Sequence, residues 1–468
     1  MNKMRRFAIS DSPFVVGTIR PLLCRVKDAQ SNLAQNRNSL PEYYYLSASP
    51  WREKLSGQRS GVGLPYPIST MPLQIIKRRS RGFICVNAHP EGCRRNIERW
   101  IAGVRGKIPG ASAGPKNVLV IGASTGYGLA SRIAAAWGCG AKTLGVFFER
   151  PPEGDKTASA GHYNMVAFHE SARRDGLFAA SLNGDAFSDE IKRSAVETIR
   201  KQMAPVDLVI YSLAAPKRTD PRTGQTHASV LKPVGQPYTN RTIELDSEKV
   251  VPVTLQPATE QEVSDTIAVM GGDDWRRWIE TLLAENLLAE GARTLAYSYI
   301  GPEITWPIYR DGTIGQAKKD LERAARDLNA TLSNKFGGRA WISVNKAVVT
   351  QASAAIPVVP LYLSVLPLVL KKKNLEEGPL EQMRRLFSNF LCTRQEPQLD
   401  EAGRIRLDDR EMRPDVQAEV AALWPQITTE NLRAMTGFAG FQREFRGLFG
   451  FEVEGVDYEK PAETDLRW

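Results

Sequence analysis

A buried strand that runs into a glycine-rich turn and then a helix is the feature that most constrains the fold of this chain. Residues 117–121 read Asn-Val-Leu-Val-Ile, a continuous apolar run typical of a strand buried on both faces of a parallel sheet. The turn that follows reads Gly122-Ala123-Ser124-Thr125-Gly126-Tyr127-Gly128, and a helical pattern extends over residues 129–137. This order predicts a phosphate-binding turn, because glycines let a backbone approach a pyrophosphate and a helix N-terminus attracts an anion.

The elements after this turn continue the alternation of strand and helix. Further strands are predicted at residues 142–149, 178–182, 206–213, 294–300 and 340–344, and helices at residues 188–203, 274–290 and 313–334. Strands that alternate with helices form a parallel sheet covered on both faces. We therefore predict an α/β fold, a doubly wound parallel sheet of the Rossmann type.

Acidic residues follow the second and third predicted strands. Glu149 lies about 20 residues beyond the glycine turn, where a carboxylate accepts hydrogen bonds from ribose hydroxyls. A carboxylate there would also repel a 2′-phosphate, which favours NADH over NADPH, although the adjacent Arg150 weakens this preference. Two interpretations of Asp185 remain open: a contact to the adenine of a bound dinucleotide, or the N-cap of the helix at residues 188–203.

A tyrosine and a lysine follow the fifth predicted strand, with eight residues between Tyr309 and Lys318. Such a pair occurs by chance in any long chain. It is evidence for function here because it follows the fifth strand of a fold that also contains a matching glycine turn. An ammonium within about 4 Å of a phenol stabilises the phenolate by roughly 1–4 kcal/mol in a partly shielded site. We therefore expect Lys318 to lower the pKa of Tyr309, which would act as a proton donor while Lys318 holds the nicotinamide ribose.

Net charge separates the first 70 residues from the rest of the chain. The 468 residues carry a net charge of +10, and residues 1–70, with ten Lys or Arg and four Asp or Glu, account for +6 of it. This segment has no sustained helical or strand period and no apolar core of a secretory signal. Two interpretations remain, a transit peptide or a disordered or misassigned leader with Met71 as the true start. The +4 on the remaining 398 residues gives no support for binding nucleic acid.

The cysteines and the apolar runs indicate the cellular compartment in which the protein is expected. The five cysteines include no Cys-x-x-Cys pair, which favours reduced thiols and disfavours a metal site. No run reaches the roughly 18–20 apolar residues that a transmembrane helix needs. We therefore expect a cytoplasmic protein without a transmembrane segment.

Further motifs carry a resemblance to a known family. They read Arg81-Gly82-Phe83-Ile84-Cys85, His89-Pro90-Glu91-Gly92-Cys93 and Tyr297-Ser298-Tyr299-Ile300-Gly301-Pro302. The glycine pattern resembles that of the short-chain dehydrogenases/reductases, but the spacing from Tyr309 to Lys318 is longer than in their usual members. Together, the motifs resemble the FabV-type enoyl-acyl-carrier-protein reductases, whose relatives include the trans-2-enoyl-CoA reductases. The resemblance covers essentially all of residues 71–468, which would form a single enoyl reductase domain.

The resemblance implies NADH-dependent reduction of the trans-2 double bond of an enoyl thioester of acyl carrier protein or CoA, the last step of the fatty-acid elongation cycle, by a monomer. It implies that Tyr309 is the proton donor, Lys318 a cofactor-binding residue and Tyr299 a contact to the thioester; Tyr299 as a packed strand aromatic stays open. The implied cofactor site consists of Gly122, Ala123, Ser124, Thr125, Gly126 and Tyr127 at the pyrophosphate, Phe148 and Glu149 at the adenosine ribose, Asp185, Ala186, Leu213 and Ala214 along the dinucleotide, and Val348, Val349 and Thr350 at the nicotinamide.

Three regions outside the alternating pattern are less constrained. Residues 217–272 are polar and proline-containing, which predicts an inserted β-hairpin lid or a surface excursion without function. Residues 356–370 are apolar, with three prolines, and predict the wall of an acyl pocket or a buried helix. Residues 371–373, three lysines, are either a solvated face or a contact to an acidic carrier. Residues 375–468 are expected to be helical, with Phe438, Phe441, Phe445, Phe449 and Phe451 packed onto the core.

Two alternatives to an enoyl reductase are separable by experiment. A different short-chain reductase, such as a ketoacyl reductase, would show its preference in a panel of enoyl, ketoacyl and alcohol substrates. A non-enzymatic basic binding protein would bind nucleic acid with a steep dependence on salt.

Overall fold

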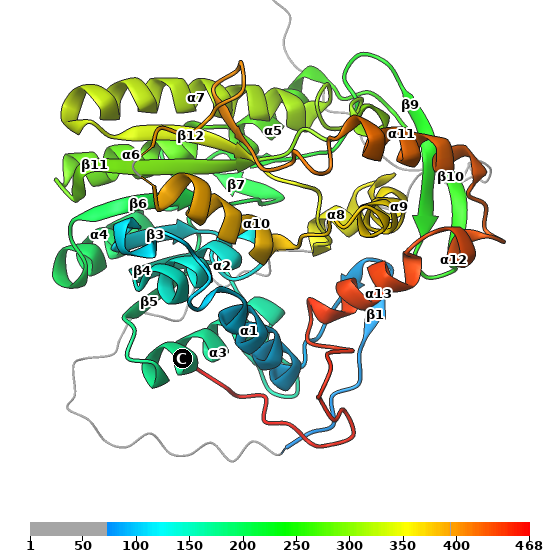
Figure 1. Cartoon of the computed structure of the whole chain (residues 1–468), viewed down its shortest axis with the longest axis horizontal. Coiled ribbons are helices and arrows are strands. Elements are labelled where there is room, and N and C mark those ends of the chain that lie inside the picture. Colours follow the sequence, from blue (N-terminus) through cyan, green and yellow to red (C-terminus); the bar gives the residue numbers. More distant parts are fainter. Residues whose placement is uncertain (1–72, 394) are drawn as a thin grey trace, which may run out of the picture. The chain divides into compact units, whose positions relative to one another are not determined.

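The computed structural model describes residues 73–393 and 395–468 (Figure 1). The predicted leader at residues 1–70 and its boundary at Met71 lie outside the described residues.

A seven-stranded parallel sheet forms the centre of the described fold. Its strands lie in the order β13-β12-β11-β6-β3-β4-β5, and every neighbouring pair is parallel. Their bounds are β3 Asn117–Ile121, β4 Lys142–Phe147, β5 Ala179–Asn183, β6 Val206–Tyr211, β11 Leu288–Ser298, β12 Arg339–Val344 and β13 Arg404–Arg406. The chain runs outward from β3 in one direction and then, from β6 on, in the other. This order confirms the predicted doubly wound α/β sheet.

The central strand β3 shows why its sequence is apolar throughout. It pairs with β4 on one side and β6 on the other, so its residues meet packed helices on both faces. Val118 and Val120 belong to one hydrophobic core, and Leu119 and Ile121 belong to another. Successive side chains of a strand point to opposite faces, and here both faces are buried.

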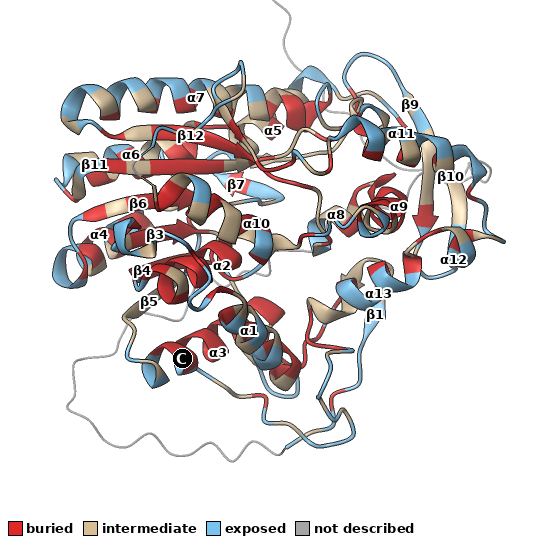
Figure 2. Ribbon diagram, viewed as in Figure 1, coloured by how far each residue is buried: buried red, intermediate tan, exposed pale blue. Residues whose placement is uncertain are grey.

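Helices cover both faces of the sheet (Figures 1 and 2). One core contains side chains from α1 Pro90–Val104, α2 Gly126–Ile133, α3 Ala160–Arg174 and α10 Pro379–Leu386. The other contains side chains from α4 Asp189–Gln202, α6 Asp273–Ala284 and α7 Thr313–Phe336. Short π-helical segments extend α2 and α10, at Ala134–Gly138 and Phe387–Leu391. A short antiparallel pair, β1 Ser80–Arg81 and β2 Ile84–Cys85, precedes α1.

The region at residues 217–272 contains more structure than the predicted hairpin. β7 Lys217–Thr219 pairs with β8 Thr226–Ala228, and β9 Tyr238–Glu244 pairs with β10 Lys249–Leu255. The predicted hairpin is therefore present, together with a second one. Helix α5 Glu260–Met270, which was not predicted, packs against α7 and begins with a capping box at Thr259 and Glu262.

A separate hydrophobic core surrounds α9 Val359–Lys372, preceded by the short α8 Gln351–Ala355. α9 is the buried helix that residues 356–370 allowed, and none of its residues lines the large cavity described below. The C-terminal helices α11 Pro414–Leu423, α12 Leu432–Met435 and α13 Phe438–Gly447 contribute to this core. The five C-terminal phenylalanines are buried in it, as predicted. In the described part of the chain, no helix is both long and apolar enough to cross a membrane.

Two of the three lysines at the C-terminal end of α9, Lys371 to Lys373, form ion pairs. Lys372 lies 3.1 Å from Glu419, and Lys373 lies 3.2 Å from Asp415 and 3.3 Å from Glu419. Both acids belong to α11, so this stretch joins two helices of the same chain.

Candidate active site

The glycine turn packs its first and third glycines against backbone and leaves the second open. A Cβ on Gly128 would lie 1.9 Å from the carbonyl oxygen of Gly122, and a Cβ on Gly122 would lie 2.3 Å from that of Ser212. A Cβ on Gly126 would meet no surrounding atom within 4 Å. The turn therefore lies tightly against the end of β6 and leaves space at the N-terminus of α2. The N-cap, Thr125, makes no side-chain capping bond, so free N–H groups remain there to attract an anion.

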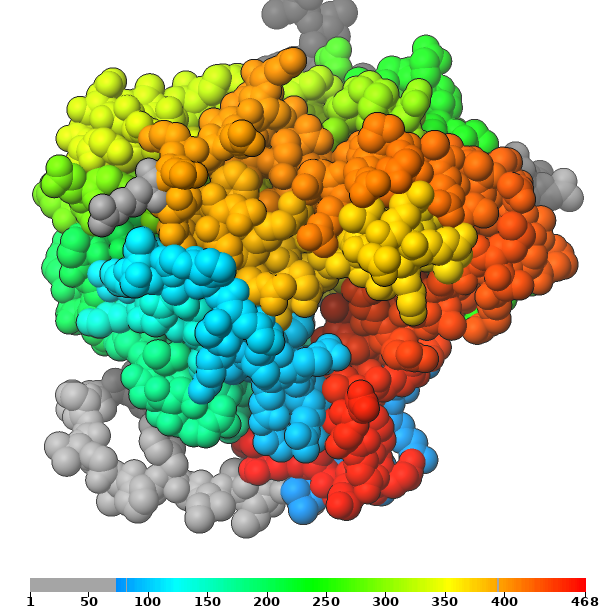
Figure 3. Space-filling model, in the orientation of Figure 1, coloured from blue at the N-terminus to red at the C-terminus, as the bar shows by residue number. Residues whose placement is uncertain are grey.

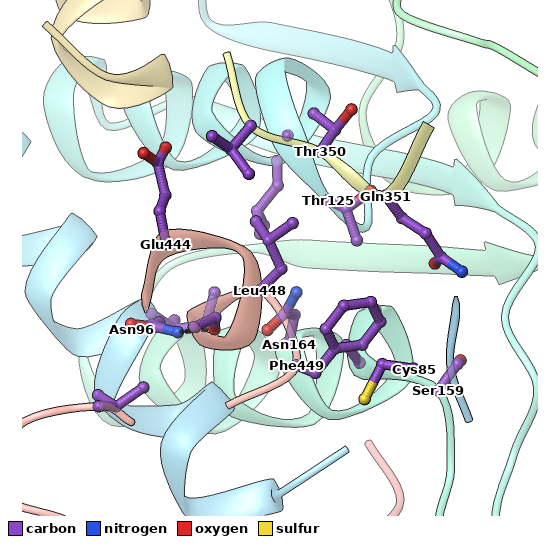
Figure 4. A pocket seen from close by; sticks show the side chains of 18 of the residues that line it. Cys85, Asn96, Thr125, Ser159, Asn164, Thr350, Gln351, Glu444, Leu448 and Phe449 are labelled. Carbon is purple, nitrogen blue, oxygen red and sulfur yellow. Dashed lines mark hydrogen bonds between the residues drawn. The ribbon is translucent and has the colours of Figure 1, made fainter. Parts of the chain in front are cut away.

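A cavity of about 1610 Å³ opens beside this turn. Thr125, Gly126 and Glu149 line it next to the sheet, and Val349 and Thr350 line it from the loop after β12. Residues of α1, α10 and α13 form further walls, and Figure 3 shows the hollow between the blue, orange and red segments. Figure 4 shows Thr125 and Thr350 in the same part of the cavity. Typical small-molecule sites enclose roughly 300–1,000 Å³, so this one has room for a ligand of dinucleotide size.

Glu149 lies directly beside the glycine turn. Ser124 and Ser159 donate hydrogen bonds to its two carboxylate oxygens over 2.6 and 2.5 Å. Asn183, at the end of β5, accepts from the backbone N–H of Glu149 and donates to its carbonyl oxygen. Burial raises the pKa of Glu149, and the two serine hydroxyls oppose this rise. The neighbouring Phe148 is 81% exposed.

The segment after β5 excludes one of the two interpretations of Asp185. Ser188 is the N-cap of α4 and accepts from the N–H of Ile191, so the interpretation of Asp185 as the N-cap is wrong. Asp185 instead accepts from the N–H of Phe187 in a turn before the helix. Lys192 donates to the carbonyl oxygen of Ala186 over 2.8 Å and so holds the backbone of this turn in place. Four residues predicted along the dinucleotide are not among the described residues that line the cavity: Asp185, Ala186, Leu213 and Ala214.

A glycine at the start of α7 lets the helix lie close to the segment that carries Tyr309. Tyr309 lies in the segment between the turn Glu303–Thr305 and α7, and Lys318 lies in the second turn of α7. A Cβ on Gly315 would lie 2.4 Å from the carbonyl oxygen of Tyr309 and 2.0 Å from that of Arg310. Only a glycine allows α7 to begin this close to the segment that carries Tyr309.

The electrostatics of this pair differ from the expectation. Lys318 donates to the carbonyl oxygen of Tyr297 over 3.2 Å, and burial lowers its pKa to about 8. The pKa of Tyr309 is raised by burial and by the nearby carboxyl of Glu411. The expectation that Lys318 lowers the pKa of Tyr309 is therefore wrong in this structure. Loss of solvent and a buried acid set the pKa of Tyr309, and the ammonium of Lys318 is directed at the backbone of β11.

A buried glutamate that was not predicted organises the tyrosines. The rings of Tyr299 and Tyr309 pack edge to face with centroids 4.8 Å apart. The hydroxyl of Tyr299 donates to Oε1 of Glu411 over 2.9 Å, and that of Tyr362 donates to the same oxygen over 2.7 Å. The backbone N–H of Ala347 donates to Oε2 over 2.7 Å. Nothing in the sequence singles out Glu411, which closes a run of charged residues that reads as a solvated loop, but its side chain is fully buried.

The loop after β12 lies between the cavity and the tyrosines. Ala347 contacts Glu411, whereas Val349 and Thr350 line the cavity. Val348 accepts a hydrogen bond from the Ser353 hydroxyl, and Thr350 is the N-cap of α8. The hydroxyl of Tyr127, in the glycine turn, donates to the carbonyl oxygen of Lys346 over 2.7 Å.

The structure thus divides the predicted site into two adjoining parts. Thr125 and Gly126 of the glycine turn, Glu149, and Val349 and Thr350 of the loop after β12 line the cavity, whereas the other predicted residues of these segments are not part of its lining. Tyr299, Tyr309 and Lys318 are not among the described residues that line it and instead gather around the end of β11. All of these residues lie at the carboxyl ends of parallel strands, the edge at which α/β sheets bind their ligands.

Three family models match consecutive segments of the chain. Residues 75–154 match the NAD(P)H-binding domain of trans-2-enoyl-CoA reductase. Residues 156–392 match the catalytic region of trans-2-enoyl-CoA reductase, and residues 399–462 match a model described as the enoyl reductase FAD-binding domain.

Relatives of known name and structure cover the same part of the chain. An enoyl-[acyl-carrier-protein] reductase [NADH] from Opitutus terrae is 56% identical over 393 residues, 84% of this chain and 99% of the relative. The trans-2-enoyl-CoA reductase of Treponema denticola, solved with NAD, is 47% identical with a TM-score of 0.81, over 84% of this chain and 100% of that one. The corresponding enzyme of a Clostridium species, solved with NADH, is 41% identical with a TM-score of 0.80, over 84% and 99%. The chain therefore belongs to the family of trans-2-enoyl-CoA reductases and NADH-dependent enoyl-[acyl-carrier-protein] reductases.

Proposed function

We propose that this protein reduces the trans-2 double bond of enoyl thioesters of acyl carrier protein or CoA with NADH, the last step of fatty-acid elongation. The observation that carries the proposal is a glycine turn with an open helix N-terminus at the sheet edge where Tyr309 and Lys318 also lie. This arrangement occurs in a chain whose named relatives are enoyl reductases. We further infer that the protein works as a monomer in the cytoplasm.

The residues around the cavity suit a dinucleotide. The uncapped N-terminus of α2 would hold the pyrophosphate, and Glu149 would accept from the adenosine ribose. Its carboxylate would repel a 2′-phosphate, which supports NADH rather than NADPH. Residues 348–350 would close on the nicotinamide, and Lys318 would bind its ribose. Bound NADH would supply a hydride to the β-carbon of the thioester.

The tyrosines would stabilise the charge that this reduction creates. Negative charge develops on the thioester oxygen, and a preorganised donor in a shielded site stabilises it where it appears. Tyr309, whose pKa is raised, stays protonated at working pH and so remains available as that donor. Proton delivery to the α-carbon completes the reduction.

The flavin named in the description of the third family model does not fit this chain. Residues 399–462 contain one strand, β13, and the helices α11, α12 and α13. Among the described residues of this segment, no strand passes through a glycine turn into a helix N-terminus. α11 begins at Pro414 behind the charged loop that carries Glu411. We therefore derive no step through a flavin.

Oxidation of NADH with a short trans-2-enoyl-CoA, followed by nicotinamide absorbance, tests the proposal. The control substrates are a ketoacyl-CoA, tested with NADH, and a simple alcohol, tested with NAD⁺. Faster turnover of either than of the enoyl-CoA would overturn the proposed function. Tyr309→Phe is expected to lower kcat by roughly 100- to 1,000-fold, the effect of removing one oxyanion donor. The Kd for NADH should stay nearly unchanged, and equal losses in kcat and in NADH binding would show that Tyr309 is structural.

A further inference from the structure

The carboxyl group of Glu411 receives three hydrogen bonds and is closed off from the protein surface. Its side chain is fully buried, on the loop between β13 and α11. Tyr299 and Tyr362 share Oε1, and the N–H of Ala347 contacts Oε2. Among the described residues, no basic group forms an ion pair with this carboxyl.

Two of these three hydrogen bonds have a fixed direction. The N–H of Ala347 can only donate. Gln417 donates from Nε2 to the backbone oxygen of Glu411 over 2.6 Å and to the hydroxyl oxygen of Tyr362 over 3.1 Å. Because a backbone oxygen can only accept, the amide orientation of Gln417 is set. Tyr362 thus accepts from Gln417, and its single proton points to Glu411.

The bond between Tyr299 and Glu411 is the one that can reverse. When Glu411 is a carboxylate, the single proton of Tyr299 points to Oε1, so Tyr299 cannot donate a hydrogen bond to any other acceptor. When Glu411 is protonated on Oε1, it donates to the oxygen of Tyr299 while still accepting from Tyr362. The proton of Tyr299 is then free to point elsewhere.

The burial of Glu411 shifts its pKa upward from the ordinary value of a glutamate. Lys346 and the donors from Tyr362, Ala347 and Tyr299 oppose this rise. The other titratable groups that feel this carboxyl, Tyr127 and Tyr309, are themselves neutral phenols with raised pKa values.

We propose that Glu411 is a positioning residue that decides whether Tyr299 donates a hydrogen bond to the thioester oxygen. In the acid form Glu411 holds the oxygen of Tyr299 and leaves its proton for the substrate; in the carboxylate form it takes that proton away. The inference rests on the proposed enoyl reduction. Tyr299 then acts beside Tyr309 as a second donor to the developing charge, and only below the pKa of Glu411.

Glu411→Gln fixes the acid-form pattern. An amide whose oxygen accepts from Ala347 directs its NH₂ group toward Tyr299 and Tyr362, and it cannot ionise. We expect wild-type kcat, at saturating NADH and thioester, to fall about a hundredfold as pH rises through the pKa of Glu411. Glu411→Gln should keep its kcat over the same range, with the KM for the thioester unchanged. A merely structural role would lower kcat equally at every pH.

Tyr362→Phe is the matched control, because it removes the other donor to the same oxygen. A carboxylate that loses a donor is less stable, so the pKa of Glu411 rises and the fall in kcat should move to higher pH. In Glu411→Gln the NH₂ group faces the hydroxyl of Tyr362, whose proton then has no acceptor. The double variant Glu411→Gln, Tyr362→Phe removes this proton and replaces the single variant in the test if the latter does not fold. Tyr299→Phe should lack the pH-dependent fall and show the low kcat throughout.

Three results separate the possible failures. A kcat profile of Glu411→Gln that falls at the same pH as the wild type overturns the inference. An unmoved fall in Tyr362→Phe also overturns it, because the step then belongs to another group. Wild-type protein that oxidises no NADH with an enoyl thioester at any pH overturns the proposed function itself.

Discussion

At the scale of single residues, the proposed role of Lys318 at the nicotinamide ribose predicts that NADH binding depends on pH. Burial lowers its pKa to about 8, so the group is charged below this pH and neutral above it. We predict that the Kd for NADH rises as pH is raised through about 8, because the proposed bond to the nicotinamide ribose is strongest from the charged ammonium. Lys318→Arg should bind NADH with little dependence on pH over this range, since a guanidinium stays charged.

Fluorescence titration of NADH at constant ionic strength measures both Kd values. A wild-type Kd that stays constant through this range would show that Lys318 does not hold the cofactor. The protonation of Glu411 is expected to affect kcat at saturating NADH. The protonation of Lys318 is followed separately, through the Kd for NADH.

The residues of the site differ in how far sequence could identify them. Glycines in the turn and Glu149 follow from general rules, because strand, turn and acid stand at set distances along the chain. Tyr309 and Lys318 needed the resemblance to a family, since their spacing alone is uninformative. Glu411 had no signal at all: a buried acid is recognised by its partners, and these come from β11, α9 and the loop after β12.

At the scale of elements, strands with continuous apolar runs were predictable and short charged ones were not. β3 and β12 match their predicted ranges to within a residue. β13 reads Arg-Ile-Arg and is a strand because it pairs with β12, with Arg404 and Arg406 neutralised by Asp400 and Asp408. Partners distant in sequence create such a strand, so no local pattern reveals it. In α13, by contrast, phenylalanines at positions 438, 441 and 445 have the helical spacing that a local pattern does reveal, and this part of the chain is helical as expected.

The contact between α4 and α6 supports a prediction about stability. Lys192 and Asp274 form a buried ion pair at 2.7 Å, with side chains 3% and 1% exposed. Tyr211 adds a hydrogen bond to the same aspartate. Asp274→Asn leaves a buried ammonium without its counter-charge, and we predict a loss of about 3–5 kcal/mol in the free energy of unfolding.

Denaturant unfolding with Glu285→Gln as the control measures this effect. Arg200 of α4 and Glu285, just after α6, form an ion pair between the same two helices, but both side chains are exposed. Removing that pair should change the free energy of unfolding by less than about 1 kcal/mol. Equal effects of the two substitutions would contradict the role assigned to burial.

At the scale of the whole molecule, catalysis is expected to need only the part of the chain that its relatives share. The first family match begins at residue 75, and 393 residues of this chain cover 99% of the relative from Opitutus terrae. We predict that a chain beginning at Met71 has the kcat and the NADH affinity of the full chain. A loss of either, measured side by side, would assign a catalytic role to residues 1–70.

The loop after β12 has a consequence for how such enzymes can be recombined. Tyr127 reaches it from the segment matched by the first family model, and Glu411 reaches it from the segment matched by the third. Ala347 and Lys346, to which they bind, belong to the second. Hydrogen bonds to this one loop therefore join all three segments. A chimaera of two family members would keep these bonds only if its first segment supplies a tyrosine at position 127 and its third a glutamate at position 411, because both side chains bind backbone atoms of the second.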